Sequence, residues 1–293
     1  MKFAVYSYRD DETEYFKKFC KKYGCEPVMC REAPSPENAA LAKGCRCIST
    51  VTAPVGGVTL KALRENGVEF VSTRSIGFDH IDVKAAEKLG IHIGNVTYAP
   101  GSVADYTVMM ILMATRKIKA ILQRAAAQDY SLRGVMGKLL SDMTVGVAGT
   151  GKIGGTIVKR LSGFDCSLLA YDLYQNDEVK KYAEYVPLDR LLAESDVITM
   201  HMPATDENRG FINKESIAKM KDGVFIVNTA RGSLINTSDF ADAVESGKIG
   251  GAALDVIENE SGIFYKNKKC DILKNRGLSV LKAFPNVIVT PHT

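Results

Sequence analysis

Three glycines at the spacing G-x-G-x-x-G lie in the middle of the chain. They are Gly149, Gly151 and Gly154, and they directly follow the strand-like run 144–148. In a dinucleotide-binding turn the first glycine allows a tight strand-to-helix turn, the second lets the backbone approach a pyrophosphate, and the third lets the helix pack closely on its strand. The motif alone is weak evidence, because glycine-rich turns without a ligand are common. Its position adds information, since about half of the 293 residues precede it.

An acidic residue follows the next strand-like run. Asp172 lies 18 residues beyond Gly154 and directly after 167–171. A carboxylate at this point accepts hydrogen bonds from the adenosine ribose hydroxyls and repels a 2′-phosphate. An aspartate at a strand end can also be a simple turn former. Together with the glycine turn, Asp172 predicts NAD rather than NADP as the cofactor.

An arginine, an acid and histidines follow other strand-like runs of the same half of the chain. Arg231, Asp255 and His292 each lie at or just beyond the end of such a run, and so does His201. In open α/β sheets, ligands bind beyond the carboxyl ends of the strands. Each residue alone could be a capping or loop residue. Their occurrence on one predicted edge, beside the glycine turn, favours a functional site.

These side chains suit the reduction of a 2-keto acid by hydride transfer. An arginine fork can hold the substrate carboxylate and polarise its carbonyl. A histidine, with an ordinary pKa of about 6.5, can protonate the nascent alkoxide. A carboxylate beside that histidine favours the imidazolium and fixes its orientation. Arg231, His292 and either Glu258 or Glu260 could supply this set.

The elements that would position these residues form two groups. Before Pro100-Gly101, strand-like and helix-like segments alternate, which predicts a small parallel sheet flanked by helices, a flavodoxin-like arrangement. The expected strands there are 3–6, 45–51, 68–72 and 91–96, and the expected helices are 12–23, 60–66 and 83–89. This region, 1–99, is the predicted substrate domain.

From residue 100 to 293 we expect a Rossmann-type, doubly wound parallel sheet that binds NAD. Its expected strands are 144–148, 167–171, 197–200, 224–228, 251–255 and 287–290, and its expected helices are 153–164, 188–194, 214–220 and 239–246. A long helix from Ser102 contains the run 108–114, which is apolar on every side and is therefore expected to be buried. Either the core of this domain or a subunit interface could bury it.

Composition excludes several other classes of protein. No apolar run approaches membrane-spanning length, and the first residues resemble a strand rather than a signal peptide. The net charge of +4 is modest and the basic residues are interspersed with acidic ones, so neither nucleic acid nor an anionic membrane is an expected partner. Five of the seven cysteines lie in the first fifty residues, a region that lacks both metal-ligand spacing and histidines. We therefore expect reduced cysteines in a cytoplasmic protein and no metal site.

Over essentially its whole length the chain resembles the D-isomer-specific 2-hydroxyacid dehydrogenases, and within them the D-lactate dehydrogenases, including the vancomycin-resistance type. The stretches that carry the resemblance are 73–82, 95–100, 149–154, 201–203, 228–232, 253–260 and 290–293, with Asp105-Tyr106-Thr107 in addition. The resemblance implies an NAD-dependent dehydrogenase. It implies that Arg231 binds and polarises the substrate, and that His292 is the acid–base residue and pairs with Glu260. Glu258 lies too early in the chain for this role and is kept in reserve.

The resemblance also implies further contacts. Backbone N–H groups around Ile76 and Gly77 would hold the substrate carboxylate, with Tyr98 close by. Lys152 and Ile153 would face the pyrophosphate, and Asp172 would bind the ribose. The path from adenine to nicotinamide would be lined by Met202, Pro203, Asn208, Thr229, Ala230 and Asp255. A cleft between the domains would close on substrate and exclude water, and the helix after Pro100 would lie in a homodimer interface.

The family continues past the His-Thr pair with a helix that returns to the first domain, whereas this chain stops at Thr293. We therefore expect the chain to be a fragment of a longer protein. The leading function is NADH-dependent reduction of pyruvate or a similar 2-keto acid to the D-(R)-2-hydroxy acid. Alternatives are a dehydrogenase for bulkier substrates (branched, aromatic or 2-ketoglutarate) and a non-catalytic NAD(H)-sensing protein. Sequence separates the substrates poorly, because one methylene in a pocket changes binding by only ~1–3 kcal/mol.

Overall fold

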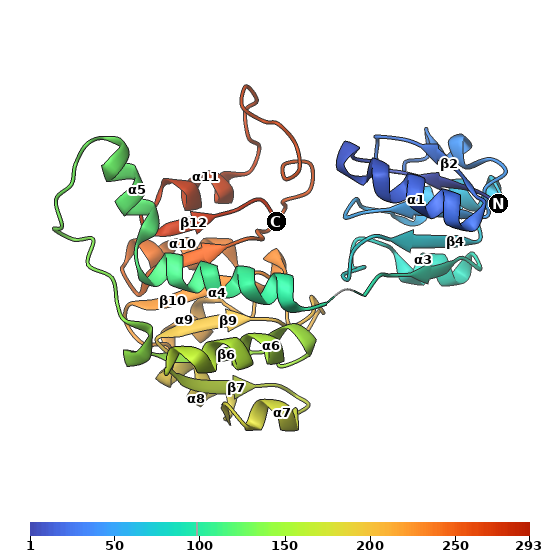
Figure 1. The fold of residues 1–293 in the computed structure, drawn as a ribbon. Coiled ribbons are helices and arrows are strands. Elements are labelled where there is room, and N and C mark those ends of the chain that lie inside the picture. Colours follow the sequence, from blue (N-terminus) through green and yellow to red (C-terminus); the bar gives the residue numbers. More distant parts are fainter. Residues whose placement is uncertain (98) are drawn as a thin grey trace. The chain divides into compact units, whose positions relative to one another are not determined.

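The computed structural model describes residues 1–97 and 99–293. The chain folds into two compact units, Met1–Tyr98 and Ala99–Thr293. Each unit is a parallel β-sheet with helices against it, drawn in Figure 1 from blue through red along the sequence. The predicted α/β fold class is therefore confirmed.

The first unit contains a five-stranded sheet in the order β2-β1-β3-β4-β5, all parallel. Its strands are β1 (Lys2–Val5), β2 (Glu26–Met29), β3 (Cys47–Thr50), β4 (Phe70–Thr73) and β5 (His92–Gly94), and its helices are α1 (Thr13–Tyr23), α2 (Gly57–Glu65) and α3 (Val83–Lys88). Strand β2 was not predicted, because Pro27 lies within it. Proline is tolerated there because β2 is an edge strand that pairs only with β1.

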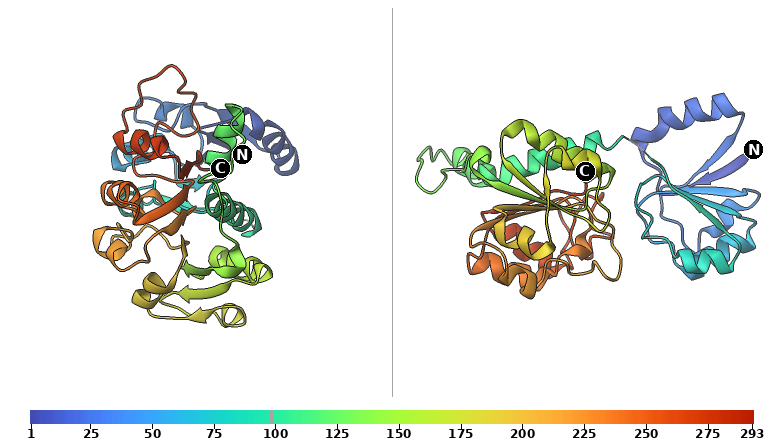
Figure 2. Two further views of the ribbon diagram at one scale, coloured as in Figure 1. Left: turned by 90° about the vertical axis from the view of Figure 1, so that its left-hand side faces the viewer. Right: turned by 90° about the horizontal axis from the view of Figure 1, so that it is seen from below.

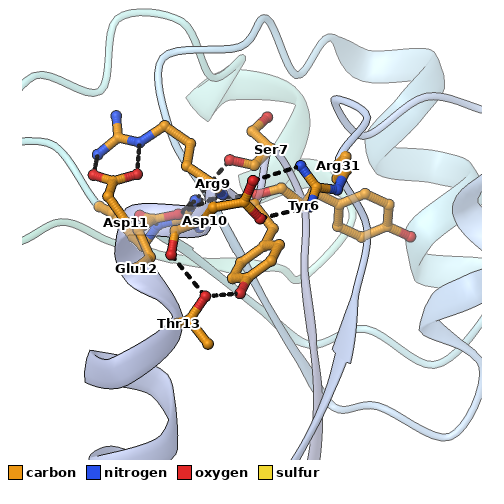
Figure 3. A network of polar contacts seen from close by, with 10 residues as sticks. Tyr6, Ser7, Arg9, Asp10, Asp11, Glu12, Thr13 and Arg31 are labelled. Atoms are coloured by element: carbon orange, nitrogen blue, oxygen red, sulfur yellow. Dashed lines mark hydrogen bonds and ion pairs between the residues drawn. The ribbon is translucent and has the colours of Figure 1, made fainter.

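A polar network fixes the start of α1 at the carboxyl end of β1 (Figure 3). Arg31 binds both carboxylate oxygens of Asp10, at 3.1 and 2.5 Å, and the Thr13 hydroxyl donates to the Asp10 carbonyl at 2.7 Å. The largely buried Arg74 also donates to Glu12, at 2.8 Å. Since Arg74 directly follows β4, this ion pair anchors the segment that enters the loop 75–77.

The second unit contains a seven-stranded parallel sheet in the order β12-β11-β10-β9-β6-β7-β8. Its strands are β6 (Thr144–Ala148), β7 (Ser167–Tyr171), β8 (Glu184–Tyr185), β9 (Val197–Met200), β10 (Val224–Asn228), β11 (Ile249–Leu254) and β12 (Val287–Val289). All six expected strands are present, and β8 is an unpredicted two-residue edge strand. The strand order reverses between β6 and β9, which makes that point the switch point where ligands bind in such sheets.

Helices cover both faces of this sheet (Figures 1 and 2), so its strands are apolar on both sides. One face packs against α4 (Gly101–Thr115) and α6 (Lys152–Leu161); the other packs against α8 (Leu188–Glu194), α9 (Lys214–Ala218), α10 (Thr237–Glu245) and α11 (Arg276–Ala283). Helices α5 (Ile118–Ala126), α7 (Asp177–Lys180) and α11 were not predicted. Helix α4 buries most of its apolar run against this core, while Met109 stays exposed.

Among the described residues, no helix is both long and apolar enough to cross a membrane. Nor do the described His, Cys, Asp and Glu side chains form a group of three or more that could hold a metal ion.

Candidate functional site

Two glycines of the turn after β6 are required by close backbone approaches. Gly149 has φ +92°, and a Cβ on it would lie 2.7 Å from the His201 carbonyl. A Cβ on Gly154 would lie 1.9 Å from the Gly149 oxygen. A Cβ on Gly151 would meet no described atom within 4 Å. Protein packing thus explains the first and third glycines, while the second leaves its backbone open to a ligand, as a pyrophosphate site needs.

The turn leads directly into α6, whose first residues are Lys152 and Ile153. The first N–H groups of a helix have no acceptor within it and lie at the positive end of its dipole. A dinucleotide pyrophosphate fits this position, next to the open Gly151 backbone.

Asp172 lies just beyond the carboxyl end of β7, beside the glycine turn. Its Oδ2 accepts hydrogen bonds from the Thr150 backbone N–H at 2.6 Å and from the Thr150 hydroxyl at 3.1 Å. Its Oδ1 accepts from the Tyr174 N–H at 3.1 Å. The carboxylate is therefore held in place next to the phosphate turn, where an adenosine ribose would lie. These residues fit an NAD molecule.

His201, beyond β9, bonds through Nε2 to the buried Thr199 hydroxyl at 2.8 Å. Burial lowers the pKa of His201 to about 3, so its ring is neutral at physiological pH. Met202 and Pro203 follow it, and the Asn208 side-chain amide donates to the Pro203 carbonyl at 2.9 Å. His201 is therefore not an acid that could supply a proton near neutral pH. The hydrogen bond of Asn208 holds the loop that carries Met202.

The segment after β10 is arranged by Asn228, a buried residue to which the sequence assigned no role. Its Oδ1 accepts from the Ala230 N–H at 3.0 Å, and its amide donates to the Arg231 carbonyl at 2.8 Å. The Thr229 hydroxyl bonds to that of Thr107 on α4 at 2.8 Å. These contacts hold the backbone that carries Arg231, whose Nη1 donates to the Ala230 carbonyl at 2.7 Å.

The structure brings His292 and Glu260 together and directs Glu258 elsewhere. His292 Nδ1 lies 2.7 Å from Glu260 Oε1, and Glu260 Oε2 accepts from the Ile257 N–H at 2.9 Å. Both side chains are about one-quarter exposed, at 28% and 25%. Glu258 instead accepts from the N–H and hydroxyl of Thr237, at 2.9 and 2.6 Å, at the start of α10. The reserve assignment of Glu258 as the partner of His292 is therefore wrong, because its carboxylate caps a helix.

Tyr265 is a neighbour of His292 that the sequence did not indicate. Its hydroxyl donates to the His292 carbonyl at 2.8 Å, and the two ring centroids lie 5.9 Å apart. Asn259, Tyr265 and His292 all have left-handed backbones, with φ of 57°, 61° and 60°. Such conformations are strained for residues other than glycine and collect at functional sites.

Asp255, at the end of β11, ties this segment to the sheet. It accepts from the Thr290 hydroxyl at 2.5 Å and from the Thr293 N–H at 2.9 Å. Burial raises the pKa of Asp255 above its ordinary value. Its contacts hold the residues on both sides of His292.

In the first unit, Ile76 and Gly77 lie in the loop after β4. Asn95 donates to the Ile76 carbonyl at 2.8 Å, and the Ser75 hydroxyl donates to the Gly77 carbonyl at 2.7 Å. With both carbonyls bound, the loop backbone is held, and neither N–H has an acceptor among residues 1–97 and 99–293. Such N–H groups can bind a carboxylate. Tyr98, the third expected substrate contact, lies outside the described residues.

Comparisons with known proteins identify the family to which this chain belongs. The model of the NAD-binding domain of D-isomer specific 2-hydroxyacid dehydrogenases matches residues 108–293. A D-specific alpha-keto acid dehydrogenase of Enterococcus faecalis is 45% identical over all of this chain and 90% of its own length. An aromatic 2-oxoacid reductase of Clostridium sporogenes is 43% identical over all of this chain and 89% of its own. The apo structure of Escherichia coli D-lactate dehydrogenase matches with a TM-score of 0.86 at 34% identity, over all of this chain and 89% of that one.

The matched range 108–293 spans the second unit almost completely, and the match to an NAD-binding domain confirms the expected NAD cofactor. The chain belongs to the D-isomer-specific 2-hydroxyacid dehydrogenases and is an NAD-dependent oxidoreductase of that family.

Proposed function

We propose that this enzyme reduces pyruvate, or a 2-oxo acid of similar size, to the D-2-hydroxy acid with NADH. The observation that carries the proposal is the 2.7 Å contact between His292 and Glu260, with Arg231 following β10 of the same sheet. Since β10, β11 and β12 are adjacent and parallel, their carboxyl ends meet at one edge. A cation, an acid–base group and its orienting carboxylate are thereby supplied together.

Each residue has a distinct task in this proposal. Arg231 binds the substrate carboxylate and polarises the carbonyl. Glu260 accepts from Nδ1–H of His292, so that Nε2–H can donate a proton to the carbonyl oxygen. The bound coenzyme supplies the hydride to the carbonyl carbon. The N–H groups of Ile76 and Gly77 are further proposed contacts for the substrate carboxylate.

On the coenzyme side, the proposed contacts come from residues of the second unit. The pyrophosphate is bound by the glycine turn and the start of α6, that is, by Gly149, Gly151, Lys152, Ile153 and Gly154. Asp172 binds the ribose. The remaining path to the nicotinamide is lined by Met202, Pro203, Asn208, Thr229, Ala230 and Asp255. The neutral His201 supports giving the proton-donating role to His292, since a ring with a pKa of about 3 is not an imidazolium acid at pH 7.

The substrate can be tested with a panel of pyruvate, 2-oxobutyrate, 2-oxoisocaproate and phenylpyruvate, following NADH oxidation at fixed pH. We expect pyruvate or 2-oxobutyrate to give the highest kcat/KM. A highest value with phenylpyruvate would favour the second candidate, an aromatic 2-oxoacid reductase, which the 43% identity to such an enzyme supports.

In the same assay, His292→Ala is expected to lower kcat by about 10²–10⁴-fold, the usual contribution of a general acid, while NADH binds nearly as in the wild type. Comparable turnover in the variant would remove His292 from the mechanism. Tight NADH binding without oxidation by any 2-oxo acid would instead favour an NAD(H)-sensing protein.

We further propose that the enzyme is a homodimer. Helix α4, which was predicted to lie in the homodimer interface, buries most of its apolar side chains against its own sheet. A homodimer interface at this helix therefore needs additional apolar surface from neighbouring segments. Helix α5 and the segment after it lie at the outer side of the second unit, beyond its sheet (Figure 1), and they carry large exposed apolar side chains. These are Leu122, Tyr130, Leu132, Met136 and Leu139. Monomers rarely expose so many such residues together, which supports a second copy covering this arm, defined as residues 118–139.

A cytoplasmic location also stays a proposal. It is supported by the seven cysteines, all of which are unpaired thiols, as reducing compartments keep them.

A further inference from the structure

A chain of hydroxyl groups connects the edge strand β8 to Asp172. The Tyr185 hydroxyl lies 2.6 Å from the Thr150 hydroxyl, which lies 3.1 Å from Asp172 Oδ2. At its other end, the Tyr185 hydroxyl accepts from the Asn176 backbone N–H at 2.9 Å. Thr150 is buried, and Tyr185 is partly buried. The glycine-turn residue Thr150 is thus bonded to a strand 35 residues away.

The chemistry of the two ends determines the direction of every proton. A carboxylate only accepts, so the Thr150 proton goes to Asp172. Because Thr150 has no second hydroxyl proton, its oxygen accepts from the Tyr185 hydroxyl, and the Tyr185 oxygen accepts from the Asn176 backbone N–H. The relay therefore runs from Asn176 through Tyr185 and Thr150 to Asp172. Hydrogen bonds in such a chain polarise and strengthen one another.

The relay also decides which part of the carboxylate a ligand can use. A carboxylate has about four acceptor positions. Thr150 takes two, both on Oδ2, and the Tyr174 N–H takes one on Oδ1. Within the described part of the chain, one position on Oδ1 is left. A ribose hydroxyl can take it, whereas a 2′-phosphate brings only negative charge toward a carboxylate that cannot turn away.

We propose that Thr150 and Tyr185 are positioning residues for coenzyme selectivity, which hold the Asp172 carboxylate at the ribose and so favour NADH over NADPH. The inference rests on the ribose-binding role of Asp172 in the proposed function. It adds that the selectivity of Asp172 depends on a tyrosine of the edge strand and a threonine of the glycine turn.

The test measures equilibrium dissociation constants for NADH and NADPH by coenzyme fluorescence, without any 2-oxo acid. Tyr185→Phe removes the hydroxyl that orients Thr150, and we expect the NADPH-to-NADH ratio of Kd to fall by about fivefold, the usual effect of one hydrogen bond. Thr150→Val, which removes the central hydroxyl, is expected to lower the ratio at least as much. Thr150→Ser, which keeps the hydroxyl, is expected to keep the wild-type ratio. Tyr182→Phe, the same change at an exposed tyrosine just before β8, is the matched control.

A double-mutant cycle separates positioning from general loosening of the fold. If Tyr185 acts through Asp172, Tyr185→Phe should leave the ratio unchanged in an Asp172→Asn background. An equal fall of the ratio in both backgrounds would overturn the inference, as would Tyr185→Phe weakening both coenzymes equally or neither. Thermal unfolding of each variant checks that it is folded.

The result is distinguishable from failure of the proposed function. A wild-type protein that binds NADPH as tightly as NADH would overturn the role of Asp172 and this inference with it. A protein that prefers NADH, loses that preference in Tyr185→Phe and yet reduces no 2-oxo acid would support the relay while contradicting the proposed reaction.

Discussion

Two glutamates separated by one residue have entirely different surroundings. Glu260 lies 2.7 Å from His292, while Glu258 binds Thr237 at the start of α10. Asn259 between them has φ 57°, a left-handed turn that sends the two side chains in different directions. The choice between these acids therefore depends on one backbone conformation, which a sequence pattern does not specify.

This difference gives a matched pair of variants. Glu260→Gln keeps the size of the side chain but removes the charge beside His292, and we expect kcat to fall by about 10²-fold or more, as when an orienting carboxylate is lost from a triad. Glu258→Gln should change kcat by less than about twofold and lower the free energy of unfolding by about 0.5–1 kcal/mol, since a charge is lost at a helix N-terminus. Steady-state kinetics and urea unfolding measure the two effects. A larger loss of kcat in Glu258→Gln would reverse the assignment.

At the scale of elements, the site depends on loops that touch where strands end. Gly232, next to Arg231, lies against the loop that carries Glu260: a Cβ there would lie 2.1 Å from the carbonyl carbon and oxygen of Ile257. Ile257 in turn donates its N–H to Glu260. One glycine thus allows the loops of β10 and β11 to place an arginine and a glutamate at the same edge.

Gly232→Ala is accordingly expected to be severe. The loops must separate, so we expect the free energy of unfolding to fall by about 3 kcal/mol or more, with loss of turnover even where the protein folds. Gly163→Ala is the control, because a Cβ at Gly163 would meet nothing within 4 Å, and it should change stability by less than about 0.5 kcal/mol. Chemical denaturation and kcat at saturating substrate check both variants. Near wild-type stability in Gly232→Ala would contradict the close approach.

The elements that the sequence predicted correctly share a strong apolar pattern. The six main strands of the second unit are continuous apolar runs because both faces of the sheet are covered. Three of the missed elements, β2, β8 and α7, lack such a signal. Strand β2 contains Pro27, β8 has two residues, and α7 has four. The short strands form because they pair with strands that lie elsewhere in the chain, as β8 does at the edge of β7.

At the scale of the whole molecule, the arm formed by residues 118–139 carries a run of large exposed apolar side chains. Leu132 and Met136 are each 83% exposed on it. Burying such side chains contributes about 1.5–3 kcal/mol each relative to leaving them in water. A second copy of the chain can cover both arms at once in a twofold dimer.

Placing charges on the arm should therefore separate the subunits. Light scattering after size exclusion should give about twice 31.9 kDa for the wild type. It should give a mass close to the single-chain value for Leu132→Glu combined with Met136→Glu, because two charges would be buried without partners. Val58→Glu, at a 73% exposed residue of the first unit, should leave the mass unchanged. A single-chain mass for the wild type would rule out the dimer. An unchanged mass in the double variant would show that the arm does not form the dimer interface.

The sequence by itself determined the class of fold, the glycine turn and the NAD cofactor, and it predicted residues that could do the chemistry. These follow from local patterns: apolar runs predict buried strands, and polar residues after them predict a ligand-binding edge. Only the tertiary structure excluded Glu258 as the partner of His292, brought Tyr265 to His292, and joined Thr150 to Tyr185 and Asp172. Those contacts join residues up to 35 positions apart in the chain, and their partners are chosen by backbone conformation and strand order rather than by spacing.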